Sequence, residues 1–490
     1  MWQQLAALRV ANAVLVQTQF DPDEFWQAGE PAHLLVFGHG HLTWEWAPLI
    51  AIRGWLHPLL LAGPMYLLKA TGMDLPLLVA LFPRVVVQSS LLVWAEYCTW
   101  QTAKRLGGSE QGIVWLTTTN WFLFYCGIRT YSNSFEACVL AGVLYLWPED
   151  APPGLGALVL ASASVAVRPT SLVSFAFLGA WYAWPRWRTL QFWELVGKRI
   201  IPTLLVCFLV SVWLDSMLYD RWVVVPFNFV RFNLWRNVAE LYGTHAWYWY
   251  FVLCFPAILG VQLPAFCWGC WDVLVKLPKG GGGLERLLGL IVCNLAVLSL
   301  SPHKELRFAL PCVLPALVLA SVGMKHRPAT TSGQRLLLLA GGGAIPALYL
   351  SLIHQRAAID TSLFLSTLPA TCRVDVLLGC HSIPHYAIVH QPLAALKFLD
   401  CSPKLPELAE YPQWNSPFRF PAHNESYLFQ HFPQQFLQAR YELLDELPNV
   451  IVTDSHHLAV VQERFSDLPV LRRFPHGQDG NTLVVLGTAC

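Results

Sequence analysis

The chain has 490 residues and a formal net charge of +1, with 55% hydrophobic residues and only 13% charged residues. In soluble globular proteins, about a quarter of all residues are charged. The composition therefore excludes a disordered chain and a nucleic-acid-binding protein with a basic face, and it disfavours most soluble enzymes. The 22 tryptophans, 15 tyrosines and 27 phenylalanines supply aromatic side chains of the kind that anchors helices at bilayer interfaces. We expect an all-α protein that crosses the membrane many times.

Apolar stretches follow one another through residues 1–354, which we predict to be a multispanning membrane domain. They cover residues 5–20, 54–70, 77–103, 111–127, 135–147, 153–167, 171–185, 200–218, 248–270, 287–301, 306–323 and 336–353. The first stretch is not an obvious cleavable signal, because it has no clear Ala-x-Ala site and further apolar stretches follow it.

Basic clusters orient these stretches, because loops rich in Lys and Arg stay on the cytosolic side. We place on that side Arg9, Lys104, Arg105 and the basic residues within 186–199, 276–286 and 325–335. The lumenal side then receives loops 21–53, 128–134, 219–247 and 302–305, and the C-terminal tail. Because the turn near Gly72 also comes out lumenal, either 54–70 re-enters the membrane or 77–103 crosses it twice. The first alternative gives about 11 spans and the second gives 13; we prefer the first.

The first lumenal loop is the richest in acids. Asp21, Asp23 and Glu24 directly follow the first span, where a carboxylate can act as a general base or bind a cation or a substrate hydroxyl. Asp21 before Pro22 also fits a helix N-cap with proline at the first helical position. Capping explains one acid but not three, so we predict a functional role for Asp23 or Glu24.

Aromatic residues surround the other charged groups of this loop, Glu30, His33 and Glu45. The indoles of Trp44 and Trp46 fit interface anchors and sugar-stacking platforms equally well. The Arg53 side chain fits either a snorkelling cation or an anion ligand.

Three more lumenal loops carry polar clusters. The turn His303-Lys304-Glu305-Leu306-Arg307 gathers cationic side chains that can clamp a phosphate, or alternatively form a surface network with Glu305. A second cluster begins at Arg129. The third comprises Asp215-Ser216 and residues 226–233 and 242–245, including His245. Four polar loops on one face favour lipid-linked chemistry at the lumenal surface.

Motifs of several other chemistries are absent from the sequence. It contains no Walker motif, no GxGxxG after a strand, no HExxH and no GxSxG. Among the lumenal loops, Asp-x-Asp occurs once, at Asp21–Asp23, and its central proline argues against a nucleotide-sugar metal site. Cys267 and Cys270 form a CxxC inside an apolar stretch without a second ligand pair. We expect no metal and no other cofactor.

The tail, residues 355–490, is predicted to be a small lumenal α+β domain. It is acidic, and none of its segments reaches the roughly 18 apolar residues of a span. Short apolar runs at 451–452 and 483–485 alternate with proline-rich loops. Cys372, Cys380 and Cys401 can form a disulfide if the tail is lumenal, but their spacing does not choose the pair. Asn424 begins a glycosylation sequon that is usable only in the lumen.

Taken together, these motifs resemble those of the dolichyl-phosphate-mannose-dependent mannosyltransferases, the multispanning GT-C enzymes of glycosyltransferase family 22. The resemblance rests on residues 21–27, 40–46, 51–53, 129–134, 242–245 and 303–308. Asp21 departs from the family, which often has His before the proline, and this leaves open whether Asp23 or Glu24 is the base. Residues 379–386 and 474–476 favour members that act on the glycosylphosphatidylinositol (GPI) precursor over those that act on the lipid-linked N-glycan precursor.

This resemblance implies inverting transfer of the third mannose, α1,2-linked, from dolichyl-phosphate-mannose to the mannosylated GPI lipid precursor. It places the active site on the lumenal face of the endoplasmic reticulum membrane. Asp23 is then the base, Glu24 assists or binds the acceptor, and His303, Lys304 and Arg307 neutralise the donor phosphate. Substrate-binding roles are expected for a further set of residues: Arg53, Arg129, Glu45, Trp44, Trp46 and His245.

Three alternatives remain. A related family member would act on the N-glycan precursor. A transporter would carry charges inside its spans and show two-fold repeats. A non-catalytic scaffold would have no need of the Asp23–Glu24 pair. The expected partners are the donor lipid, the GPI acceptor and membrane lipid, with no nucleic acid, and the sequence identifies no protein partner.

Overall fold

The computed structural model describes residues 2–236, 243–276, 282–325, 332–411, 424–442, 446–476, 481–488 and 490. Within them, two compact units can be distinguished. The first comprises Met1–Ala13, Ile52–His57 and Arg84–Leu348, and the second comprises Val14–Ala51, Pro58–Pro83 and Tyr349–Cys490. The C-terminal tail therefore belongs to the same unit as the first polar loop. The domain boundary expected between residues 354 and 355 stays a prediction.

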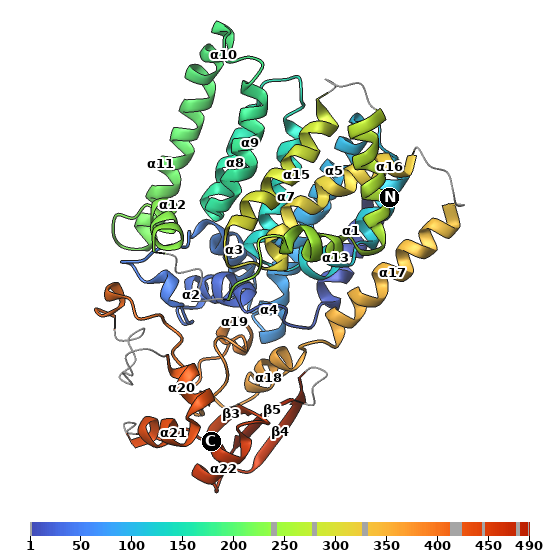
Figure 1. The fold of residues 1–490 in the computed structure, drawn as a ribbon. Coiled ribbons are helices and arrows are strands. Elements are labelled where there is room, and N and C mark those ends of the chain that lie inside the picture. The colour runs from blue at the N-terminus through green and yellow to red at the C-terminus, as the bar shows by residue number, and fades with distance from the viewer. Residues whose placement is uncertain are drawn as a thin grey trace. The chain divides into compact units, whose positions relative to one another are not determined.

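The first unit is built of helices, and all the predicted apolar stretches are largely helical (Figure 1). Within this unit α5 packs on α7, α7 on α8, α8 on α11, and α14 on α16. Its helices are α5 (Ser89–Arg105), α6 (Glu110–Thr119), α7 (Ser132–Leu146), α8 (Leu155–Val167), α9 (Leu172–Ala183), α10 (Leu190–Leu195), α11 (Ile201–Leu218), α12 (Val225–Val230), α13 (Phe255–Leu259), α14 (Leu263–Trp271), α15 (Gly283–Leu300) and α16 (Val313–Lys325). Three helices cross the unit boundary: α1 (Trp2–Leu15), α3 (Leu56–Thr71) and α17 (Ser332–Leu352).

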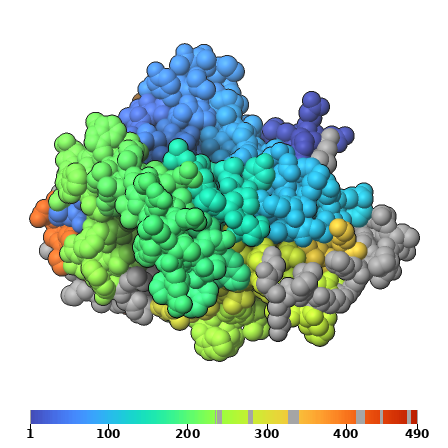
Figure 2. Space-filling view, turned by 90° about the horizontal axis from the view of Figure 1, so that it is seen from above, coloured from blue at the N-terminus to red at the C-terminus, as the bar shows by residue number. Residues whose placement is uncertain are grey.

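Five helical stretches among the described residues are long and apolar enough to cross a membrane: Pro76–Arg105, Leu190–Leu218, Tyr250–Val275, Gly283–Leu300 and Leu306–Lys325. They differ in their surroundings. The most apolar window of Leu306–Lys325 is 89% buried, whereas that of Leu190–Leu218 is 11% buried. The former is thus a central helix, and the latter presents apolar side chains outward, as a lipid-facing helix does. The green surface in Figure 2 includes this outer helix.

The stretch predicted at 77–103 is one continuous helix, Pro76–Arg105, in which α4 (Pro76–Pro83) joins α5 through a π-helical turn. A continuous helix cannot cross a bilayer twice, so the 13-span alternative is excluded. Helix α3 (Leu56–Thr71) starts directly after the first polar loop, and near its end Lys69 Nζ donates to the carbonyl of Val36 in that loop. A re-entrant course for residues 54–70 stays a prediction. The total of about 11 spans stays a prediction.

Glycines allow α14 and α16 to approach closely. A Cβ on Gly269 would lie 2.0 Å from the Leu319 carbonyl oxygen, and one on Gly323 would lie 2.4 Å from the Ala265 carbonyl oxygen. Neither position can hold a larger residue without moving the backbone. Small residues at helix contacts of this kind are common in membrane proteins, because close backbone approach supplies the packing energy between helices.

Several ionisable residues inside the apolar helices have partners within the fold, which corrects the expectation for Arg9. Arg9 does not mark a cytosolic loop; it is buried in α1, where its guanidinium forms an ion pair with Glu96 of α5 and donates to the Thr117 carbonyl. Glu136 of α7 binds Arg168 at 3.0 Å. Asp215 of α11 accepts the Trp55 N–H at 2.8 Å. Partners within the fold offset the cost of burying these charges, so they do not indicate a transport pathway.

The tail folds around a mixed five-stranded sheet, which confirms its predicted small mixed α and β character. The strands are β1 (Arg373–Val376), β2 (Ala395–Phe398), β3 (Val450–Asp454), β4 (Val470–Pro475) and β5 (Thr482–Gly487), in the order β2-β1-β3-β5-β4. β1 pairs in parallel with β2 and β3, whereas β5 is antiparallel to β3 and β4. The predicted apolar runs at 451–452 and 483–485 lie in β3 and β5.

Helices cover both faces of this sheet, because residues along its strands alternate between the two faces. Val450, Val452, Leu483 and Val485 pack with α18 (Ala357–Leu365) and α19 (Tyr386–Val389). Ile451, Val484 and Leu486 pack with α20 (Glu425–His431), α21 (Pro433–Glu442) and α22 (Leu458–Arg464). The same unit contains α2 (Glu30–Phe37), α4 and most of α3.

A buried ion cluster joins the sheet to α20 and α21. The Arg440 guanidinium donates to both carboxylate oxygens of Asp375 on β1, each at 3.0 Å, and to Glu425 at 3.0 Å. The Tyr441 hydroxyl donates to Asp375 at 2.8 Å. Each buried charge thus has a partner, as stability in a low-dielectric core requires.

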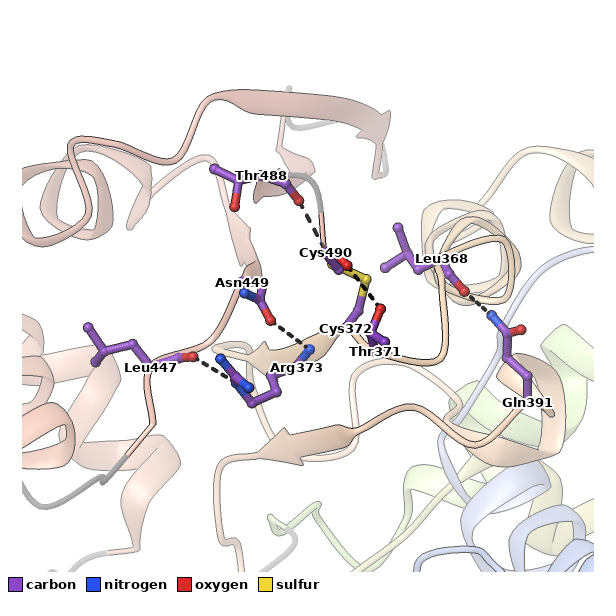
Figure 3. Close-up of a disulfide and its surroundings, with 9 residues drawn as sticks. All are labelled: Leu368, Thr371, Cys372, Arg373, Gln391, Leu447, Asn449, Thr488 and Cys490. Carbon is purple, nitrogen blue, oxygen red and sulfur yellow. Dashed lines mark hydrogen bonds between the residues drawn. A yellow bond between two sulfur atoms is a disulfide. The ribbon is translucent and has the colours of Figure 1, made fainter.

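Two disulfides close the tail: Cys372–Cys490 and Cys380–Cys401. Sequence spacing could not select them, since the first joins residues 118 positions apart and uses a cysteine that the sequence analysis did not consider. Figure 3 shows Cys490 held against the start of β1, where the Thr371 hydroxyl donates to the Cys490 carbonyl at 3.0 Å. Beside it, the Arg373 N–H donates to the Asn449 side chain at 3.1 Å.

Replacing both Cys372 and Cys490 by Ser should destabilise the tail by about 2–5 kcal/mol, because a long crosslinked loop restricts the unfolded chain. The measurement is the midpoint of thermal unfolding of the purified, non-reduced protein. Cys293→Ser, at a half-buried free cysteine of α15, should leave that midpoint nearly unchanged. Equal midpoints for the double variant and the wild type would contradict this account.

Candidate functional site

The predicted site residues fall into two sets, one in each compact unit. Asp23, Glu24, Trp44, Glu45 and Trp46 belong to the second unit. The first unit holds Arg53, Arg129, His245, His303, Lys304 and Arg307.

A helix begins at the acidic motif, and the three acids occupy different places in it. Asp21 Oδ1 accepts the Asp23 N–H at 3.0 Å, and the Pro22 carbonyl accepts the N–H groups of Phe25 and Trp26. Asp21 is therefore the N-cap that the Asp-Pro sequence indicated. Asp23 is half-buried, whereas Glu24 is fully buried. The next turn, η1 (Phe25–Gly29), is π-helical, an irregularity that is frequent at functional sites.

Trp44, Glu45 and Trp46 form one short 3₁₀ turn and are all buried. Because both indoles are buried, they do not act as bilayer-interface anchors. The Glu45 carboxylate accepts a hydrogen bond from the Gln27 side chain at 3.3 Å, which ties this turn to η1. A sugar-binding role for the three residues stays a prediction.

Glu30 is a fully buried carboxylate at the start of α2. Its Oε1 accepts the N–H groups of His385 at 3.1 Å and Ala387 at 2.9 Å, and its Oε2 accepts the His41 N–H at 3.2 Å. Burial raises the pKa of Glu30 to about 7, although the three N–H groups favour the charged form and lower it. Glu30 therefore titrates near neutral pH while it connects three separate segments of the chain.

Four histidines of this region of the second unit are held neutral. Burial lowers the pKa of His33 to about 3, that of His41 to about 4 and that of His381 to about 4. Burial also lowers the pKa of His385 well below its usual value. These imidazoles act as packing groups and hydrogen-bonding partners rather than as cations at physiological pH.

The basic turn of the first unit is internally bonded, with Lys304 and Arg307 buried and His303 and Glu305 half-buried. His303 Nε2 lies 2.8 Å from a Glu305 carboxylate oxygen, and the Arg307 guanidinium forms an ion pair with the other oxygen. Burial would raise the pKa of Glu305, but Arg307 and His303 outweigh it and lower that pKa to about 2. Lys304 Nζ does not contact Glu305 and instead donates to the carbonyls of His245 and Ser301. The two chain segments 243–245 and 301–304 are thereby joined.

Arg168 is a neighbour of this turn that the sequence analysis missed. Its guanidinium lies 5.6 Å from the centroid of the Phe308 ring, and that of Arg307 lies 5.5 Å from the same centroid. Arg168 also donates to Glu136 and Ser132, each at 3.0 Å. Its only sequence signal was an isolated charge between two apolar stretches. Two arginines on one ring make this region suited to an anionic group.

Two other predicted anion ligands are held in different ways. The Arg53 backbone is clamped: the Tyr219 hydroxyl donates to its carbonyl at 2.8 Å, and Asp215 holds the neighbouring Trp55 N–H. Arg129 is fully buried, with its Nε donating to the Tyr125 carbonyl at 3.0 Å and its guanidinium 4.6 Å from the Tyr125 ring centroid.

His245 stacks on Trp249, with ring centroids 4.7 Å apart. Tyr242, which the sequence grouped with it, lies outside the described residues. In the tail, Asn424 caps α20, where its side chain accepts the Tyr427 N–H at 2.9 Å. Its glycosylation stays a prediction.

Because the pKa of Glu30 rises from 4.5 to about 7 on folding, the folded protein binds this proton more tightly than the unfolded chain. The contribution of Glu30 to the free energy of unfolding is therefore greatest below pH 4.5. It decreases as the pH rises and is about 3 kcal/mol smaller above pH 7. Glu30→Gln should remove this loss. Thermal unfolding midpoints of variant and wild type, compared from pH 4.5 to 7.5, should diverge as the pH rises.

Glu463→Gln, at an exposed position of α22, provides the control and should follow the wild-type curve. The buried histidines affect all three proteins alike, so their titration cancels in the difference. Parallel curves for Glu30→Gln and the wild type would show that Glu30 does not titrate in this range.

Comparisons with known proteins agree with this architecture. The GPI alpha-1,2-mannosyltransferase 3 of Mus musculus is 31% identical over 458 residues, which cover 91% of this chain and 80% of the mouse protein. The mannosyltransferase APTG1 of Arabidopsis thaliana is 32% identical over 433 residues, which cover 81% of this chain and 76% of the plant protein.

A crystal structure of ArnT from Cupriavidus metallidurans, bound to undecaprenyl phosphate, has the same fold. The TM-score is 0.63 at 12% identity, over 100% of this chain and 97% of ArnT. The predicted polytopic GT-C-type fold is thereby confirmed. The sequence profile of the Alg9-like mannosyltransferase family matches residues 1–390. This chain therefore belongs to the Alg9-like mannosyltransferase family, glycosyltransferase family 22.

Proposed function

We propose that this protein transfers the third, α1,2-linked mannose from dolichyl-phosphate-mannose to the GPI anchor precursor. The observation that best supports the proposal is that the relatives of this chain are all the same kind of mannosyltransferase. Relatives from mouse, human and fruit fly that are 30–31% identical to this chain are all GPI mannosyltransferase 3. The chain covers 72–80% of their lengths, so the similarity is not confined to one segment.

In the proposed reaction, the 2-hydroxyl oxygen of the second mannose attacks the anomeric carbon of the donor. The new carbon–oxygen bond forms as the bond from that carbon to the phosphate oxygen breaks. The hydroxyl proton passes to a carboxylate, and inversion converts the β-linked donor into an α-linked product. Asp23 is the proposed base, because it is half-buried while Glu24 is fully buried. Glu24 then orients the helix start or the acceptor.

Dolichyl phosphate leaves with negative charge, which cationic groups can stabilise in the transition state. We assign this role to Arg307 and His303, with Lys304 shaping the turn through its bonds to two carbonyls. Arg168 adds a second guanidinium beside Phe308. The ArnT crystal structure contains undecaprenyl phosphate, a polyprenyl phosphate of the same chemical class as this leaving group.

The proposed location is the endoplasmic reticulum membrane, with the reaction on the lumenal side. Two disulfides support it, because disulfides persist in oxidising compartments and are rare in the cytosol. Both lie in the unit that also carries Asp23 and Glu24. The reacting carboxylates therefore belong to a unit suited to the lumen.

Expression of this chain in cells that lack the third GPI mannose should restore that mannose and the surface display of GPI-anchored proteins. The measurement is a lipid profile of radiolabelled GPI intermediates. Continued accumulation of the two-mannose intermediate, despite normal expression, would refute the proposed acceptor. An altered profile of lipid-linked N-glycan precursors instead would identify the related family activity.

Asp23→Asn should lower the rate of mannose transfer at least about 100-fold, because the amide cannot accept the hydroxyl proton. Asp21→Asn is the matched control: asparagine also caps a helix, so the turn and most of the activity should persist. The assay uses purified protein at equal folded amounts. Wild-type transfer by Asp23→Asn would exclude Asp23 as the base.

A further inference from the structure

One face of the helix that follows the proposed base lies along a segment of the C-terminal tail. Trp26, Glu30, His33 and Phe37 are four, three and four residues apart, so they form one stripe along η1 and α2. We call this stripe and tail residues 381–390 the seam. The two segments run parallel along the seam: Trp26 contacts His381 at one end, and Phe37 contacts His390 at the other.

Trp26 forms the first part of the seam, two residues after Glu24. Its indole N–H donates to the Ile383 carbonyl at 3.2 Å. Its ring lies 4.5 Å from that of His381 and 4.7 Å from that of His385, measured between centroids. The indole is buried, so the third residue after Asp23 is fixed by both a hydrogen bond and ring packing.

Glu30 forms the centre through the N–H groups of His385 and Ala387. Beside it, Gly29 allows the close approach of the two segments, since a Cβ at this position would lie 3.2 Å from the Ala387 Cβ. At the far part, His33 Nε2 lies 3.0 Å from His390 Nδ1, and the Phe37 and His390 rings are 4.6 Å apart. The helix is thus bonded along its whole length.

The tail segment bends in unfavourable conformations at both ends of the seam. His381 has φ +54°, and His390 has φ +61° with ψ −56°. At His390 the Gln391 N–H donates to the Val389 carbonyl at 2.7 Å, which closes a γ-turn that L-residues rarely adopt. Such strain persists only where surrounding contacts impose it, and it gathers at functional sites.

We propose that tail residues 381–390 form a positioning element for the transfer reaction, and that Glu30 and Trp26 are positioning residues that fix the orientation of the Asp23–Glu24 helix start. The inference rests on the proposed function. A base displaced by about 1 Å can lose about 100-fold in rate, so a helix held at three points along one face is a physical means of keeping it in place. The seam thereby gives this part of the tail a role in catalysis.

The desolvation cost of burying Glu30 supports its positioning role. Glu30 is a buried carboxylate that a neutral side chain could replace at lower desolvation cost. A charged acceptor, however, binds several N–H groups strongly and fixes their directions. The groups that face Glu30 are the backbone N–H groups of His41, His385 and Ala387 and, on the tail segment, the side chain of Tyr386.

The first test measures kcat and KM for donor and acceptor with Glu30→Gln, in purified protein matched for folded amount. The expected result is a kcat about 10- to 100-fold lower with KM values nearly unchanged, because the base is misplaced while substrate binding remains. Trp26→Phe, which loses the bond to Ile383 and part of the ring packing on His381 and His385 but keeps the Glu30 contacts, should lower kcat by a smaller factor.

Glu425→Gln is the matched control. Glu425 is a buried carboxylate of the same unit that also accepts a backbone N–H, from Asp400 at 2.8 Å, but it lies in the ion cluster of the sheet. It should retain the wild-type kcat even if its thermal stability falls. An equal loss of kcat in both variants would indicate general destabilisation and overturn the inference.

A second experiment applies if Glu30→Gln fails to fold. Gly29→Ala should press on Ala387 and lower kcat, and the added Ala387→Gly should restore it, because the second change removes the opposing methyl group. Wild-type kcat in Glu30→Gln, raised KM values with unchanged kcat, or no rescue by Ala387→Gly would overturn the positioning role while leaving the proposed function intact. A wild-type protein without mannosyl transfer would instead overturn both.

Discussion

In the second unit, one buried carboxylate joins segments that lie far apart in the chain. Glu30 accepts backbone N–H groups from His41 and from His385 and Ala387, residues more than 350 positions further along the chain. Burial makes the charged form of Glu30 costly, and the three N–H groups offset part of that cost. These hydrogen bonds join the first polar loop to the tail and, in the proposed role, hold the acidic helix start in a defined orientation.

The first unit solves the same problem by pairing charges within apolar helices. Arg9 with Glu96 and Arg168 with Glu136 bury opposite charges side by side. In both units, therefore, some buried charged residues hold structural elements together, and others are the ionic groups proposed for the transfer reaction. The position of a charged residue in an apolar stretch does not distinguish these two uses. The residues that it contacts in the structure do.

Sequence patterns predicted the helices, the mixed tail domain and the N-cap at Asp21, because each depends on local periodicity or on neighbouring residues. They missed Arg168, whose significance comes from Phe308, 140 positions away in the chain. They also misplaced Arg9, because a lone basic residue near a helix start looks the same whether it faces water or Glu96. Disulfide pairing and the seam were beyond reach for the same reason, since both are set by long-range packing.

The most direct test of the central claim is an experimental structure with an unreactive donor lipid and a two-mannose GPI acceptor. The account predicts the Asp23 carboxylate within hydrogen-bonding distance of the 2-hydroxyl on the second mannose, with Glu30 still bound to the N–H groups of His385 and Ala387. An acceptor hydroxyl bound to a different carboxylate, or a helix start detached from the tail segment in the substrate complex, would contradict it.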